Sequence, residues 1–144
     1  MIAPDVNVLI YALRHEMPRH VEYRTWLDQS RVGPEPLMLF EPVLASVVRI
    51  TTNPRIFPNP TRLETLEAFI TALLASPACR TVRAGEQHFA TFLELCRRAD
   101  CRGDLVQDAY LAALAIEQGC DWITTDRDFA RFTGLRWRHP LDPQ

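Results

Sequence analysis

The chain has 144 residues, 47% of them hydrophobic, and a formal net charge of −2. This size and composition are typical of one folded domain, and they exclude a disordered chain and the run of roughly 20 apolar residues that spans a bilayer. The opening MIAPDVNVLI lacks the basic start of a secretory signal, so we expect one cytoplasmic domain over residues 1–144, without membrane contact.

Apolar periodicity and turn residues predict a regular succession of strands and helices. In chain order we expect a strand at 2–5, helices at 6–13 and 20–29, a strand at 37–40, helices at 41–51 and 61–74, a strand at 79–82, helices at 86–98 and 104–118, a strand at 122–125, a short helix at 126–132 and a strand at 135–139. Strands alternating with helices indicate an α/β/α sandwich around a mostly parallel sheet of about five strands.

Details within these helices predict which residues face the core. In 104–118 the apolar stripe consists mainly of alanines, which favours close packing on the sheet, and Gly119 follows as a C-terminal cap. Thr61 and Glu64 have the spacing of a capping box. Core-facing positions are also expected at Val21, Trp26, Leu63, Leu66, Phe69, Ile70, Leu73, Phe89, Phe92, Leu93 and Cys96.

Acidic residues follow several of the expected strands directly. Asp5 follows the first strand, Glu41 the second and Asp126 the strand at 122–125. Ligands of parallel α/β sheets bind at the carboxyl ends of the strands, so these three acids are expected at one edge. The helix at 104–118 leads into the strand that ends at Asp126, so its first turns, with Asp104 and Asp108, are expected over the same edge.

Each acid alone has a simpler explanation as a helix cap, because aspartate is favoured there. Several carboxylates at one edge, however, repel each other strongly unless a cation neutralises them. The chain has no lysine, and Arg127 is the only basic residue directly beside these acids in sequence. We therefore expect a hard divalent cation, Mg²⁺ or Mn²⁺, which activates water for phosphodiester cleavage. Asn7 and Asp128 are expected as supporting members of the site.

The same segments resemble the PIN-domain nucleases, and specifically the VapC toxins of bacterial toxin–antitoxin pairs. Four segments carry the resemblance, in order and over nearly the whole chain: DVNVLIYA at 5–12, RITTNPRIF at 49–57, DAYLAALA at 108–115 and TTDRDF at 124–129. The last is similar to a T-x-D-x-D-F element of that family. Each motif alone is weak, and their order makes the match specific.

The resemblance implies a PIN-like fold and an endoribonuclease that uses Mg²⁺ or Mn²⁺. It also implies a homodimer and a cognate VapB antitoxin that inhibits it. By position, Asp5, Asp108 and Asp126 fall on the acidic, metal-binding site. The family's second acid has no counterpart near Ser46, and Glu41, five residues earlier, is the candidate to replace it as a catalytic carboxylate.

Other site classes lack their required residues. Haloacid-dehalogenase phosphatases, phospho-receiver domains and P-loop NTPases need a lysine, and a G-x-S-x-G hydrolase motif is also missing. The cysteines form no C-x-x-C pair, which argues against a zinc site and favours reduced thiols in the core. The remaining alternative is a catalytically weakened PIN fold that only binds RNA or a protein, and the displaced second acid favours it.

Four arginines are placed where RNA phosphates are within reach: Arg14, Arg19, Arg49 and Arg55. Arginine forms bidentate contacts with phosphate, which makes this assignment chemically reasonable. A solvated helix face or a salt bridge explains each of them equally well, so the sequence leaves both interpretations open.

Overall fold

The structure is a computed structural model that describes residues 1–143. Its elements follow the predicted order throughout. They are β1 (Ile2–Pro4), α1 (Val6–Leu13), α2 (His20–Ser30), β2 (Leu37–Phe40), α3 (Glu41–Thr51), α4 (Leu63–Leu74), β3 (Cys79–Val82), α5 (His88–Arg98), α6 (Asp104–Gln118), β4 (Asp121–Ile123), the 3₁₀ helix η1 (Arg127–Arg131) and β5 (Trp137–Arg138).

All five strands run parallel, in the order β3-β2-β1-β4-β5. The chain moves outward from β1 to β2 and β3, and then crosses back to add β4 and β5 on the other side of β1. The register pairs Ile2 with both Leu37 and Asp121, and Pro4 with Ile123. The carboxyl ends of β1 and β4 are therefore adjacent, at the point where the strand order reverses and α/β sheets bind their ligands.

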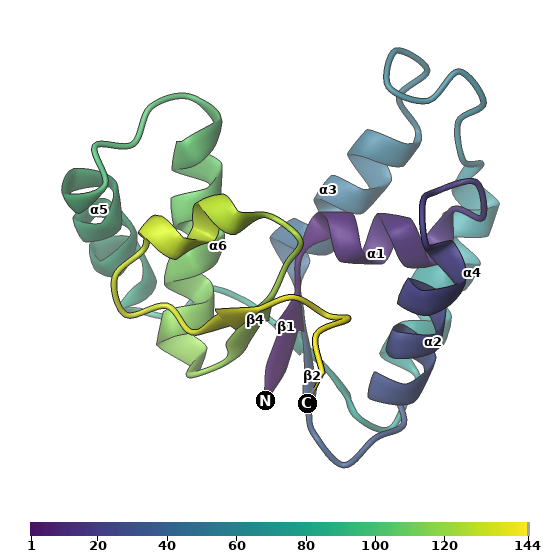
Figure 1. The fold of residues 1–144 in the computed structure, drawn as a ribbon, viewed down its shortest axis with the longest axis horizontal. Helices are drawn as coiled ribbons and strands as arrows, with labels where there is room; N and C mark the ends of the chain where they lie inside the picture. Colours follow the sequence, from purple (N-terminus) through teal and green to yellow (C-terminus); the bar gives the residue numbers. More distant parts are fainter. Residues whose placement is uncertain (144) are drawn as a thin grey trace.

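Helices cover both faces of the sheet, which confirms the predicted α/β/α sandwich. Figure 1 shows α1, α2, α3 and α4 grouped on one side of the strands, and α5 with α6 on the other. The core between these layers includes a row of aromatic rings, in which Trp122 lies 5.7 Å from Phe40 and 5.5 Å from Phe129 between ring centroids. Burial of such large apolar side chains is the main force that holds the layers together.

The alanine-rich face of α6 is buried as predicted. Ala109, Ala112 and Ala113 are 0% exposed, and the helix ends at Gly119, whose φ of +64° is the left-handed cap conformation. Small side chains let the helix approach its neighbours closely, at the density of an organic crystal. This helix also carries Asp108, one of the residues predicted for the acidic site.

Some local predictions were wrong at positions where tertiary contacts decide. Thr61 does not cap α4, because this helix begins after Arg62 and has no side-chain cap. The hydroxyl of Thr61 accepts a hydrogen bond from Arg14 instead. Four residues expected in the core are exposed, because they lie outside the face that their helix buries: Val21, Leu63, Phe89 and Leu93.

Within residues 1–143, no helix combines the length and apolarity that crossing a membrane requires. All four cysteines are free thiols, as predicted.

The close packing of α6 makes a direct prediction for stability. Ala112→Leu adds three carbon atoms where no space exists, so it should lower the free energy of unfolding by about 1–3 kcal/mol. Ala90→Leu is the matched control, because Ala90 is exposed on α5, and it should change stability by less than about 0.5 kcal/mol. Urea denaturation followed by circular dichroism measures both. Equal effects of the two substitutions would contradict this packing.

Candidate active site

Asp5 lies at the centre of the site, between β1 and α1. Its backbone N–H donates to the carbonyl of Ile123 at 2.8 Å, which ties it to the end of β4. Its side chain is only 6% exposed and caps α1: Oδ1 accepts the N–H of Val6 at 2.7 Å, and Oδ2 accepts the hydroxyl of Thr124 at 2.6 Å. The cap interpretation of this residue is therefore confirmed, and the same carboxylate remains available for the predicted site.

Thr124 links two of the acids, a role the sequence analysis did not assign. The side chain is 0% exposed, and its hydroxyl oxygen also accepts the N–H of Asp126 at 3.0 Å. One hydroxyl thus fixes the carboxylate of Asp5 and the backbone of Asp126 relative to each other. The available signal was the threonine that begins the T-x-D-x-D-F segment.

Asp126 and Asp128 lie at the start of η1, beside the end of β4. Oδ1 of Asp126 caps η1 by accepting the N–H of Asp128 at 2.8 Å, which leaves Oδ2 of Asp126 available. Asp128 is exposed and pairs with Arg131 at 3.3 Å. Asp126 therefore belongs to the inner part of the site, and Asp128 to its margin.

Asp108 approaches the same edge from α6. It is partly exposed, and within residues 1–143 no donor forms a hydrogen bond with its carboxylate. Asp104 lies one turn earlier, in the first turn of the helix, and is exposed. The helix therefore presents two acids, of which Asp108 is the more enclosed.

The electrostatics show that these acids share one region. Burial raises the pKa of Asp5 to about 6, with a further contribution from the charge of Asp126, although the hydrogen bonds from Thr124 and Val6 act in the opposite direction. Burial also raises the pKa of Asp108 to about 6, and the charges of Asp5, Asp126, Asp128 and Asp104 add to this. Five carboxylates thus act on each other at the switch point of the sheet.

The donor chemistry of this cluster fits a hard divalent cation. The groups are carboxylates, whose oxygens retain free lone pairs, and burial, together with neighbouring negative charges, raises the pKa values of Asp5 and Asp108. In the part of the chain that the structure describes, no three His, Cys, Asp or Glu side chains are close enough together to hold a metal ion already. The carboxylates thus interact through their charges without forming a ready-made coordination shell.

Two further predicted residues are oriented differently. Glu41 is the first residue of α3 and forms an ion pair with Arg83, with 2.9 Å between Nε and Oε1. Ser46, near the expected position of the family's second acid, lies further along the same helix, and its side chain is not a carboxylate. Asn7 is exposed on α1, two residues beyond Asp5. The structure therefore groups Asp5, Asp108 and Asp126, and it places Glu41 in a separate ion pair.

Comparison with known proteins adds independent evidence. The family model described as PIN domain matches residues 2–135. The chain is 44% identical to VapC ribonuclease Mb2897 of Mycobacterium bovis, over 100% of this chain and 98% of that protein. It is 39% identical to Ribonuclease VapC25 of Mycobacterium tuberculosis, over 97% of this chain and 99% of that protein.

Solved structures share the fold at lower sequence identity. VapBC2 from Rickettsia felis bound to a promoter DNA fragment gives a TM-score of 0.72 at 16% identity, covering 96% of this chain and 98% of the other. VapC20 of Mycobacterium tuberculosis, described as a sarcin-ricin loop cleaving toxin, gives 0.68 at 19% identity, covering 94% and 99%. The architecture, the acidic edge and the full-length matches agree: this chain belongs to the PIN domain family and, within it, to the VapC group.

Proposed function

We propose that this chain is a Mg²⁺-dependent endoribonuclease toxin that a VapB-type antitoxin neutralises in the cytoplasm. The observation that carries the proposal is the convergence of Asp5, Asp108 and Asp126 from three separate elements at one edge of the sheet. Such a concentration of negative charge repels the phosphates of RNA unless a divalent cation is present. Full-length relatives named as ribonucleases support RNA as the substrate.

Asp5, Asp108 and Asp126 would hold the cation, with Mn²⁺ as an alternative to Mg²⁺. When bound, the ion activates a water and offsets the charge that develops on the scissile phosphate. The hydroxyl of Thr124 donates a hydrogen bond to Oδ2 of Asp5, which orients the carboxylate and favours its ionised form against the effect of burial. Glu41 is the proposed fourth catalytic carboxylate, whose ion pair with Arg83 would have to open. Asn7, Asp104 and Asp128 would orient water around this centre.

The partners in this proposal follow from the relatives. Structural neighbours include complexes described as VapBC and FitAB assemblies, which supports a small antitoxin as the inhibitor. We also propose that the chain forms a homodimer, as the resemblance to VapC toxins implies. The alternative is a PIN fold that binds RNA or protein without cleaving, and the ion pair of Glu41 is the observation that favours it.

The central test is RNA cleavage by the purified chain with Mg²⁺, Mn²⁺ or EDTA. Asp5→Asn keeps the size of the side chain but removes its charge, so cleavage should fall by at least about 100-fold, as expected for a group that contacts the metal directly. Asp100→Asn is the matched control, because Asp100 is exposed and pairs only with Arg102, and it should retain activity. Electrophoresis of a structured RNA substrate gives the rates.

The same experiment distinguishes an endoribonuclease from a PIN fold that binds RNA without cleaving it. If the wild-type protein binds the RNA but leaves it intact with every metal, the chain is a binding module. If Asp5→Asn cleaves as fast as the wild type, the assigned carboxylate is wrong.

The hydroxyl of Thr124 should matter for catalysis through Asp5. Thr124→Val keeps the shape and removes the donor, so activity should fall by about 10–100-fold, as for other groups that orient a metal ligand. Thr124→Ser retains the hydroxyl and should stay within about fivefold of the wild type, a range well below that loss. Steady-state cleavage rates at saturating Mg²⁺ measure both. Equal activity of the Val and Ser variants would show that the hydrogen bond has no catalytic role.

Without metal, the buried charge of Asp5 should destabilise the protein in a pH-dependent way. Its pKa is raised to about 6 in the folded chain from an ordinary value of 3.8, so the protonated form favours folding. The contribution of Asp5 to stability should therefore be greatest below about pH 4 and be lost as pH rises through about 6. In EDTA near pH 7.5, Asp5→Asn should be more stable than the wild type by about 1–3 kcal/mol.

Urea denaturation at a series of pH values tests this prediction, with Asp100→Asn as a control that should follow the wild type. Addition of Mg²⁺ should stabilise the wild-type protein but not Asp5→Asn, because only a folded state that binds the ion gains from it. Parallel pH profiles for wild type and Asp5→Asn would contradict the destabilising role of this charge.

A further inference from the structure

Most arginines of this chain are occupied within the fold. Of the sixteen, only Arg49, Arg55 and Arg127 have guanidinium groups without a hydrogen bond or ion pair to any residue in 1–143. The others bind carboxylates, hydroxyls or backbone carbonyls, as Arg14 and Arg19 do. Arg14 and Arg19 are therefore paired within the fold, whereas the side chains of Arg49 and Arg55 have no partner within residues 1–143.

The free arginines lie on both sides of the acidic site. Arg127 directly follows Asp126 at the end of β4, on one side of β1. Arg49 lies in the last turn of α3, the helix that follows β2 on the other side of β1, and Arg55 lies six residues further on. In Figure 1, α3 and the loop beyond it project from the sheet on the side opposite α6. In the strand order, the free arginines thus follow strands on opposite sides of β1, the strand that ends at Asp5.

The loop beyond α3, which we call the arm (residues 52–62), is ordered by its own hydrogen bonds. Its base is closed by the N–H of Thr61, which donates to the carbonyl of Thr51 at 2.8 Å. At its start, the side chain of Asn53 accepts the N–H of Arg55 at 3.0 Å, and its carbonyl accepts the N–H of Phe57 at 2.9 Å. Prolines at 54, 58 and 60 restrict the backbone further. The arm therefore presents Arg55 from a prearranged backbone.

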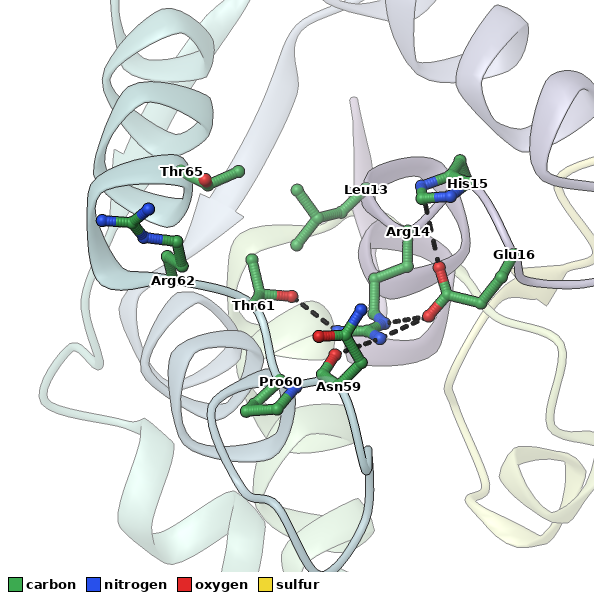
Figure 2. Close-up of a pocket in the computed structure, with 9 residues that line it drawn as sticks. All are labelled: Leu13, Arg14, His15, Glu16, Asn59, Pro60, Thr61, Arg62 and Thr65. Atoms are coloured by element: carbon green, nitrogen blue, oxygen red, sulfur yellow. Dashed lines mark hydrogen bonds and ion pairs between the residues drawn. The ribbon is translucent and has the colours of Figure 1, made fainter.

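Arg14 fastens the arm to the end of α1. Its side chain is 9% exposed, and its guanidinium lies 4.0 Å from the ring centroid of Phe57. Nη1 donates to the hydroxyl of Thr61 and Nη2 to the carbonyl of Asn59, both at 2.8 Å, while Nε donates to Glu16 at 2.6 Å. Figure 2 shows this guanidinium enclosed between the two segments. Such a forked set of bonds requires arginine and is not available to lysine.

We propose that the arm is an RNA-holding element, in which Arg49 and Arg55 contact phosphates of the substrate strand and Arg14 is the positioning residue that keeps the arm in place. This inference rests on the proposed function. A loop that is already ordered loses little conformational entropy when it binds RNA. This gives a physical reason for the buried Arg14 to anchor the arm. Arg127 extends the same phosphate path on the other side of the carboxylates.

The test measures RNA binding separately from cleavage. Fluorescence anisotropy of a labelled single-stranded RNA gives the dissociation constant between about 50 and 200 mM salt, in the Asp5→Asn background, which lowers the negative charge of the acidic edge and leaves the RNA intact. Arg49→Gln with Arg55→Gln should weaken binding on the order of tenfold and reduce the slope of log K against log salt by about 1.4, because each lost phosphate contact removes about 0.7. The matched control is Arg97→Gln with Arg98→Gln, which removes two charges that both pair with Glu94 and should change binding little.

The outcomes separate this inference from the proposed function. If the wild type cleaves RNA, and the double variant of the arm binds RNA as tightly as the Arg97→Gln, Arg98→Gln control, the arm proposal is wrong and the proposed function stands. If the arm variants bind RNA normally but lose affinity for an antitoxin, the arm is a protein-binding surface instead. If the wild-type protein neither binds nor cleaves any RNA, both proposals fail.

Arg14 is tested by a variant that keeps the charge. Arg14→Lys should raise KM several-fold with kcat within about twofold, because the arm loses its position while the carboxylates do not. It should also speed trypsin cleavage after Arg55. Thr61→Val removes a single bond of the anchor and should have the same effects more weakly, which keeps the test valid if Arg14→Lys folds poorly. Unchanged KM and unchanged trypsin cleavage in a folded Arg14→Lys would overturn the positioning role.

Discussion

The pairing of β1 with β4 is the constraint on which the site depends. It brings Asp5 and the segment after Ile123 together although they are far apart in sequence, and the hydroxyl of Thr124 then fixes their geometry through two hydrogen bonds. Because the sheet is parallel, α6 must run back to the amino-terminal end of β4, so its own amino-terminal end lies over the carboxyl edge. One topological choice therefore assembles three acids from three elements.

This arrangement works against stability. The carboxylates of Asp5 and Asp108 are partly removed from water and repel each other, and both pKa values are raised to about 6 as a result. The core has to supply the opposing free energy, and the closely packed alanines of α6 and the aromatic row around Trp122 lie directly behind the site. A cation at the acidic edge would remove this repulsion.

The arginines show a complementary division. A chain without lysine has to build its ion pairs from arginine, and only the folded structure distinguishes the paired arginines from the unpaired ones. Arg14 is buried and holds the arm through hydrogen bonds to Asn59 and Thr61. The side chain of Arg55, on the same arm, has no partner within residues 1–143. The fold thus separates arginines that hold its segments together from arginines whose side chains have no partner within residues 1–143.

The sequence alone determined much of this protein. Apolar spacing located α1 and β2 to the residue, since local periodicity controls helices and strands of buried faces, and acids directly after strands identified Asp5 and Asp126. Contacts between distant segments were decided only in the tertiary structure: Thr61 binds Arg14 rather than capping α4, Glu41 pairs with Arg83, and Thr124 joins Asp5 to Asp126. Phe89 and Leu93 are exposed because α5 buries a narrower face than its apolar pattern suggests. The physical reason is common to all of these cases. A residue's intrinsic preference is local, whereas the partner of a polar group and the width of a buried face depend on which segments the sheet brings together.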